Sequence, residues 1–178
     1  MGKRTSLLTI IFLALGGFMV SCLTPPSYNS TPEIAFLKVS YFDNKGNDSC
    51  ITTISFKDKE GDLGLASIGS DTSKPYKGDY YFNYWSEMYV KKKGEWKKVI
   101  FTGPAFYGRF APIYKEKPPG PVNGEIDLTF TIPNTTLQST AGQIAARDTV
   151  KFTIQIVDRA LHVSNLVETN PFRINLNN

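Results

Sequence analysis

Alternating apolar and polar residues dominate this chain from residue 34 to its end. In such a run one set of side chains faces a core while the intervening set faces water, which is typical of β-strands. The alternation is clear at 50–56, 126–132, 150–156 and 172–176, and weaker at 34–41, 80–91 and 96–102. The pattern therefore predicts about seven short strands in an all-β chain.

The arrangement that suits these strands is a single antiparallel immunoglobulin-like β-sandwich over residues 33–178. Residues 92–95 predict a hairpin, because Gly94 allows the positive φ of a tight turn. Prolines make 103–124 a long loop or an irregular edge strand, and only 137–147 could form a short helix. On the two weaker strands at 34–41 and 80–91, the inward-facing sets are expected to be Ala35, Leu37, Val39 and Tyr41, and Phe82, Tyr84, Met88 and Val90.

The N-terminus has the parts of a secretory signal peptide, with basic Lys3 and Arg4, an apolar stretch over 7–20, and small Ser21. The apolar stretch has 14 residues, whereas a helix needs about 20 to span a bilayer. An uncleaved membrane helix is therefore the weaker alternative. We expect residues 1–21 to be removed and the proline-containing residues 22–32 to form an extended tether.

The ending Met19-Val20-Ser21-Cys22 resembles a bacterial lipobox, in which the cysteine receives diacylglycerol and becomes the first residue of the mature protein. The resemblance implies that Cys22 is a lipid attachment site. The expected location is the bacterial cell envelope, in the outer membrane, facing either the periplasm or the surface. Cys50 would then lack a disulfide partner and lie buried in its strand. Plain secretion with a Cys22–Cys50 disulfide is the alternative.

Charge adds one exclusion. The formal net charge is +4, and the signal peptide contributes Lys3 and Arg4 to it. The remaining chain has no strong positive field of the kind that indicates nucleic-acid binding. Five lysines within 91–98 could contact anionic headgroups, although lysines on a hairpin also discourage edge-to-edge strand pairing.

Acidic residues gather after two of the predicted strands. Asp58, Glu60 and Asp62 follow the strand at 50–56, and Asp158 follows the strand at 150–156. In an immunoglobulin-like strand order these two loops lie at the same end of the sandwich. Carboxylate oxygens are the ligands that calcium prefers, so the four residues form a candidate calcium site. The alternative is that they only shape turns, because Asp bonds readily to nearby backbone.

Two sequence signatures carry a family resemblance. The segment Phe56-Lys-Asp-Lys-Glu-Gly-Asp-Leu-Gly64 resembles the hallmark Phe-x-Asp-x-Asp-Gly-Asp-Leu-Gly of a group of uncharacterised Gram-negative bacterial lipoproteins. The segment from Asp158-Arg-Ala to Ser164-Asn165 is similar to their second signature, and to the Asp-x-Ala-Gly-Asn-x-Ser turn of bacterial immunoglobulin-like domains. The resemblance implies a lipid-anchored β-sandwich and no known activity. This chain has Glu60 where Asp is usual, and Leu161-His162 where Gly-Asn would suit the turn.

Aromatic residues form a second constellation. Tyr81, Trp85 and Tyr89 recur every four residues, so on a strand they share one face. Such rings could stack on sugars or contact a protein partner. The alternative is that the loop at 103–124 or the tether covers them.

Catalysis is not expected. The chain has a single histidine, His162, and no Gly-x-Ser-x-Gly elbow, zinc-ligand cluster or phosphate-binding glycine loop. A Cys50–His162 dyad and a glycosidase-like carboxylate pair are the remaining enzymatic alternatives. The sequence thus favours a lipid-anchored, non-enzymatic cell-envelope protein with a binding or structural role, whose partners are the membrane and an envelope protein or glycan. A calcium-stabilised carbohydrate-binding accessory domain is the alternative.

Overall fold

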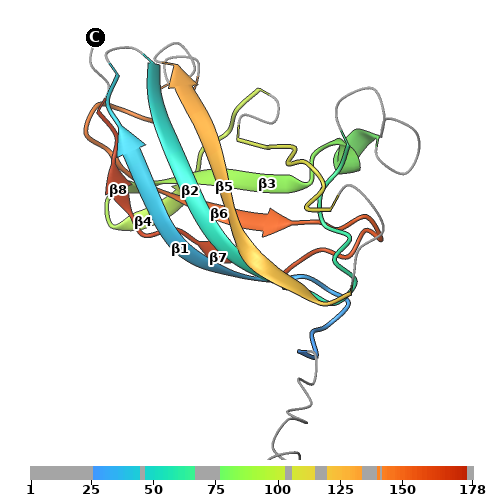
Figure 1. The fold of residues 1–178 in the computed structure, drawn as a ribbon. Coiled ribbons are helices and arrows are strands. Elements are labelled where there is room, and N and C mark those ends of the chain that lie inside the picture. The colour runs from blue at the N-terminus through green and yellow to red at the C-terminus, as the bar shows by residue number, and fades with distance from the viewer. Residues whose placement is uncertain are drawn as a thin grey trace, which may run out of the picture.

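The computed structural model has two antiparallel sheets packed face to face (Figure 1). It describes residues 26–44, 47–66, 77–102, 106–114, 120–133, 140 and 142–175. The signal peptide expected at 1–21 and the lipid attachment site expected at Cys22 lie outside these residues. The all-β sandwich predicted from the alternation is confirmed.

One sheet contains three strands, β1 (Glu33–Phe42), β2 (Asn47–Asp58) and β5 (Val122–Pro133), in the order β1-β2-β5. The other contains β3 (Tyr84–Lys92), β4 (Glu95–Lys98), β6 (Thr149–Ile156), β7 (Val167–Glu168) and β8 (Phe172–Arg173). Its order is β4-β3-β6-β7, and β8 also pairs with β6. The chain changes sheet after β2, β4 and β5, which is the strand order of an immunoglobulin-like sandwich.

The core lies between the central strands of the two sheets. Alternate side chains of β2 and β6 are buried, namely Cys50, Thr52, Ile54 and Phe56 on β2 and Val150, Phe152, Ile154 and Ile156 on β6. A hydrogen bond of 2.8 Å joins Thr52 Oγ1 to the Tyr84 hydroxyl and satisfies two polar groups deep in this core. Burial raises the pKa of the free Cys50 thiol to about 12, so the thiol stays protonated, as expected of an inert core cysteine.

A β-bulge on β1 overturns the predicted inward face in the first half of that strand, whereas Val39 and Tyr41 pack against the core as expected. Leu37 and Ala35 were expected to point inward, but both are exposed, and Leu37 retains 47% of its surface. The pairing register with β2 shifts between Phe36 and Lys38. The extra residue puts Ile34 and Phe36 on the core face before the bulge and Val39 after it.

Several other elements differ from the prediction. Residues 78–81 form a 3₁₀ turn, η1 (Gly78–Tyr81), so β3 begins only at Tyr84. Strand β4 ends at Lys98, and β7 was not predicted. Residues 142–147 form turns, and the short helix expected at 137–147 is not found among the described residues. The β3–β4 hairpin is confirmed, with positive φ at Lys93 (52°) and Gly94 (90°).

The loop between β4 and β5 reaches back into the sandwich. Phe106 is buried, with ring centroids 5.6 Å from Phe130 and 5.0 Å from Phe152. Gly108 then pairs with Tyr84 as an isolated antiparallel bridge. The described part of 103–124 thus behaves as an irregular edge strand pinned by an aromatic anchor.

Candidate metal centre

Asp58 and Asp158 are buried because they continue the core-facing alternation of the two central strands. On β2 the next core-facing position after Phe56 is Asp58. On β6 the next such position after Ile156 is Asp158. Their exposed fractions are 0% and 2%. The two strands belong to facing sheets, so both carboxylates point into the interior at one end of the sandwich.

A tight turn after β2 brings the third carboxylate back to this point. The Gly61 and Asp62 amides donate to Asp58 Oδ2 at 2.6 and 3.2 Å, with Gly61 at a φ of 70°. Leu63 then forms a bridge with Asp158. Gly64 must remain glycine, because a Cβ atom there would lie 2.3 Å from the Ala111 carbonyl oxygen. The Leu-Gly pair of the first signature therefore fixes the loop against its neighbours.

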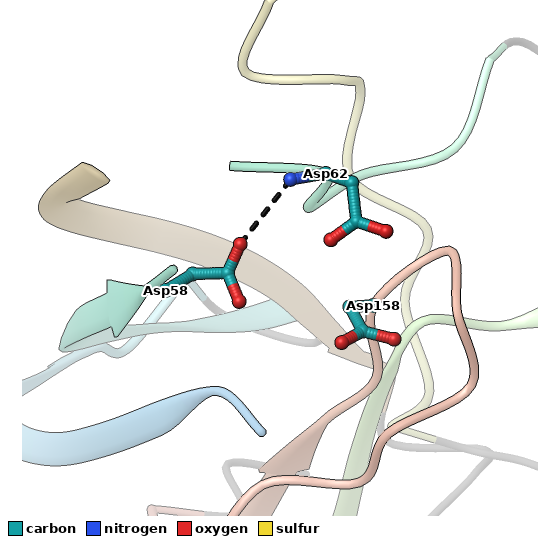
Figure 2. A group of neighbouring side chains, drawn as sticks. All are labelled: Asp58, Asp62 and Asp158. Atoms are coloured by element: carbon teal, nitrogen blue, oxygen red, sulfur yellow. Dashed lines mark hydrogen bonds between the residues drawn. The ribbon is translucent and has the colours of Figure 1, made fainter. Parts of the chain in front are cut away.

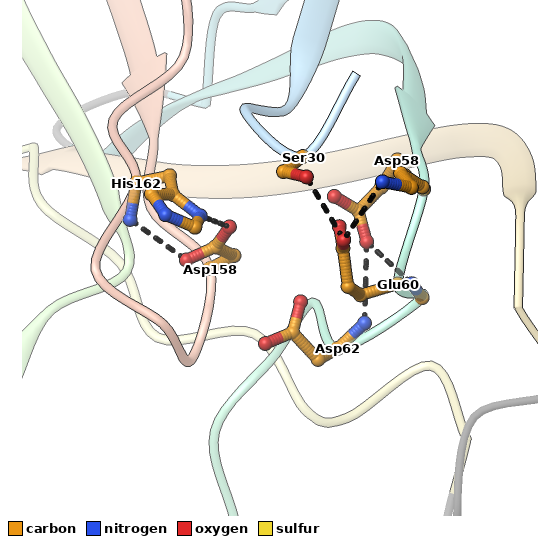
Figure 3. A network of polar contacts seen from close by, with 8 residues as sticks. Ser30, Asp58, Glu60, Asp62, Asp158 and His162 are labelled. Atoms are coloured by element: carbon orange, nitrogen blue, oxygen red, sulfur yellow. Dashed lines mark hydrogen bonds and ion pairs between the residues drawn. The ribbon is translucent and has the colours of Figure 1, made fainter. Parts of the chain in front are cut away.

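Three carboxylates converge as a result. One oxygen from each of Asp58, Asp62 and Asp158 lies within 4.8 Å of the other two. Figure 2 shows Asp158 facing Asp58 and Asp62 from a different segment of the chain. Glu60, the fourth predicted ligand, is not part of the cluster. Its carboxylate is exposed, accepts a 2.9 Å hydrogen bond from Ser30 and lies 3.9 Å from the Lys59 ammonium (Figure 3).

The cluster is only partly satisfied by the protein. The His162 amide donates to Asp158 Oδ1 at 2.8 Å, and His162 Nδ1 lies 2.9 Å from Asp158 Oδ2 (Figure 3). In contrast, Asp58 Oδ1 and Asp62 Oδ1 are buried and have no hydrogen-bond partner. A buried polar atom without a partner costs about 1–3 kcal/mol, and more when it is charged.

The electrostatics reflect this crowding. Burial, and then repulsion from Asp62 and Asp158, raises the pKa of Asp58 to about 6. Burial and the Asp158 charge likewise raise the pKa of Asp62. The hydrogen bond to Asp158 raises the pKa of His162, because the carboxylate favours the protonated ring. The site therefore disfavours its own negative charges and would favour an added cation.

The ligand chemistry suits a hard cation. Calcium binds six to eight oxygens at 2.3–2.6 Å, so ligands on opposite sides of the ion lie about 4.6–5.2 Å apart. Three oxygens within 4.8 Å of one another can therefore share one ion. The remaining positions would be filled by backbone carbonyls or water.

His162 is the contact that the sequence reasoning missed. It was noted as the lone histidine of a loop, but not as the partner of Asp158. Its spacing of four residues after Asp158 was the available signal, because a tight turn returns such a residue to the aspartate. In that turn Leu161 adopts a φ of 70°, at the position where the related turn carries glycine.

The other polar residues of the second signature are structural. Ser164 Oγ accepts a hydrogen bond of 3.0 Å from the Ile156 amide. The Asn165 side chain holds the start of β1, accepting from the Ile34 amide at 2.8 Å and donating to its carbonyl at 2.9 Å. The signature thus ties β6 and β1 together beside the carboxylates.

The predicted aromatic face is not assembled as expected. Tyr81 lies in η1. Its ring centroid is 4.9 Å from that of Phe82, and the Arg109 guanidinium lies 5.3 Å from the Tyr81 ring centroid. Trp85 and Tyr89 do share the outer face of β3 and are half-buried. The 3₁₀ turn breaks the alternation before Tyr84, so Tyr81 does not continue the strand on which the prediction placed it.

Comparisons with known proteins add no family. Within the part of the chain that the structure describes, no helix has the length and apolar character needed to cross a bilayer. No protein-family model, curated protein or solved structure matches the chain.

Proposed function

We propose that this chain is a lipid-anchored, non-enzymatic cell-envelope protein whose β-sandwich binds calcium through Asp58, Asp62 and Asp158. The observation that carries the proposal is the convergence of three carboxylates with two buried, unpartnered oxygens. Such oxygens are uncommon in native structures and indicate an ion or another missing partner.

The cation would link the two sheets of the sandwich. Asp58 ends β2 and Asp62 lies in the loop after it, whereas Asp158 follows β6 in the opposite sheet. An ion bound to all three would join the two sheets at one end and offset the repulsion between the carboxylates. Because it binds only the folded chain, it would stabilise the domain by about 2.7 kcal/mol at 100 times its dissociation constant.

The lipid anchor would place this end near the membrane. Residues 28–30 contact the metal-centre loop and its surroundings, through a 3.2 Å bond from the Lys59 amide to the Asn29 carbonyl and a 2.9 Å bond from Ser30 to Glu60. From Cys22 to Tyr28 an extended chain covers at most about 20 Å. A lipidated Cys22 would therefore hold Tyr28 within that distance of the bilayer surface, with the metal centre beyond it.

The Cys50–His162 dyad has little support. His162 contacts Asp158, which lies beside Asp58 at the end of β2. Cys50 lies eight residues earlier on that strand, about 26 Å away at the rise of an extended chain. Its buried, protonated thiol is thus far from the only histidine.

The geometry gives less support to carbohydrate binding, the further activity in the calcium-stabilised alternative. Tyr81 does not join Trp85 and Tyr89 on one face, and the Lys151 ammonium lies 6.0 Å from the Tyr89 ring centroid. A sugar would have to compete with this cation for the ring.

Calcium titration tests the proposal. The protein is residues 22–178 with Cys22→Ser, freed of metal by chelation. We expect heat of binding at a single site, and a melting temperature that rises by several degrees at millimolar calcium. Asp158→Asn should abolish both responses, whereas Glu60→Gln, the matched control outside the cluster, should keep them. If millimolar calcium produces no heat of binding and no thermal shift, the proposal is refuted.

A further inference from the structure

The outer edge of β3 has a gap in its pairing. Strand β4 pairs with β3 only from Tyr89 to Lys92, and the Val99 amide donates to the Met88 carbonyl at 2.9 Å. The chain returns to this edge at Gly108, which exchanges hydrogen bonds of 2.8 and 3.0 Å with Tyr84. Between these two contacts, Ser86 has no ladder partner on this edge among the described residues.

A cavity of about 440 Å³ lies at this gap. Its lining is largely apolar and aromatic and includes Phe82, Met88, Val99, Phe101 and Phe106. Phe106 and Phe101 meet edge to face with centroids 5.1 Å apart, and Phe106 also packs on the core. The aromatic wall is therefore preformed, and the volume falls in the range of small-molecule sites, roughly 300–1,000 Å³.

Ser86 supplies a second, independent indication of a ligand. It occupies a core-facing position of β3, is 2% exposed and lines the cavity. Its Oγ atom is buried and has no hydrogen-bond partner. A buried hydroxyl in that state destabilises the empty domain and is available to a bound molecule.

Charged residues at the cavity limit the kind of ligand. Lys98 and Glu87 form an ion pair of 2.6 Å and so neutralise each other. Asp79 adds a negative charge to the lining. The balance disfavours an anion and tolerates a neutral or cationic molecule.

We propose that this β3-edge cavity binds a small uncharged or cationic molecule with a flat, apolar body and a hydroxyl or amide group that bonds to Ser86. The aromatic wall would pack against the body of the ligand. An extended peptide fits less well, because within the described part of the chain the gap leaves a single residue of β3 unpaired on this edge. None of these lining residues belongs to the metal centre, so the inference stands apart from calcium binding.

Protein-observed NMR with 2-phenylethanol tests the cavity, using residues 22–178 with Cys22→Ser. We expect saturable shifts of the amide signals of Ser86, Ile100 and Gly108. Phenylacetate, which has the same ring but carries a negative charge, should bind at least about fivefold more weakly. Absence of saturable shifts in these amides, or equal binding of the two probes, would overturn the proposal.

Two variants separate binding from folding. Ser86→Ala should weaken 2-phenylethanol binding about fivefold and yet raise the melting temperature by about 3 °C, because it removes an unpaired buried hydroxyl. Ile100 lines the cavity and is 62% exposed, so Ile100→Ser should weaken binding and leave the fold intact. Leu37→Ser, the matched control on an exposed apolar residue of the other sheet, should bind as the parent protein does. Unchanged binding in both cavity variants would contradict the proposal.

Discussion

An aspartate lies at or near each end of the two central strands, β2 and β6. The partners of these aspartates differ between the two ends of the sandwich. At one end, Asp48 precedes the core positions of β2, accepts a hydrogen bond from the Tyr41 hydroxyl and takes another from the Asn44 amide at 3.1 Å. At the same end, Asp148 precedes β6 and pairs with Lys92 at 2.5 Å. At the other end, Asp58 and Asp158 converge with Asp62, and two buried oxygens have no partner.

Under our proposal, the difference separates aspartates with a structural role from aspartates that bind a cation. Asp48 and Asp58 lie on one strand and one face, with exposed fractions of 1% and 0%. Because the protein supplies donors to Asp48, that end can fold without help. Asp58 keeps an oxygen without a donor, and under our proposal a cation would complete this end. Burial and residue type alone therefore do not identify a site; the missing partner does.

The largest expected effect is at the end of the sandwich that contains Asp48. Asp48→Ala should destabilise the domain by about 3 kcal/mol, because it removes the acceptor of the Tyr41 hydroxyl and the Asn44 amide. Urea unfolding with and without calcium measures the change. The loss should be the same in both conditions, and a calcium-dependent loss would show that the ends are not independent.

At the end of the sandwich that contains Asp58, loss of the aspartate should change the stability in the opposite direction. At pH 7.5 without calcium, Asp58→Asn should stabilise the domain by about 2 kcal/mol, because it removes a buried charge whose pKa is raised to about 6. The same variant should lose the stabilisation by calcium. Urea unfolding in chelator and then in calcium gives both values, and destabilisation in chelator would argue that the carboxylate is already satisfied.

The raised pKa of Asp58 also predicts how the stability depends on pH. The folded-state pKa of Asp58 lies above its ordinary value of 3.8, so protonation of Asp58 favours the folded state. This contribution is complete below about pH 4 and is lost as the pH rises through about 6. The stability of the calcium-free protein should fall over that window relative to Asp58→Asn, and parallel pH profiles would contradict the assignment.

The smallest expected effect concerns the turn after β6. Leu161 adopts a φ of 70°, which costs an ordinary residue about 1 kcal/mol and costs glycine nothing. Leu161→Gly should therefore stabilise the domain by up to about 1 kcal/mol, less the extra entropy of glycine in the unfolded chain. Thermal melting measures it, with the exposed Leu166→Gly as a control that should destabilise.

The sequence predicted those parts of the molecule that follow regular alternation. Asp58 and Asp158 could be found because each follows a clear run of alternating strand residues, and the immunoglobulin-like order placed their loops together. Asp62 was included because it lies in the same short loop. Glu60 was grouped with them as a ligand, but the turn that brings the Asp62 carboxylate inward leaves Glu60 outside the cluster.

The sequence failed where the backbone departs from a regular strand. One extra residue at Leu37 exchanges the two faces of β1, and no local residue type announces the bulge. The 3₁₀ turn before β3 removes Tyr81 from the expected aromatic face. The β3-edge cavity depends on where β4 ends and Gly108 returns, which is set by tertiary contacts of Phe106 rather than by its neighbours in sequence.

A crystal structure of the calcium-loaded protein tests the central claim most directly. We expect one anomalous difference peak between Asp58, Asp62 and Asp158, with Asp58 Oδ1 and Asp62 Oδ1 at about 2.3–2.6 Å from the ion. The surroundings of Asp48 and Asp148 should remain free of metal. No peak at millimolar calcium, or a peak held by Glu60 instead of Asp58, would contradict the account.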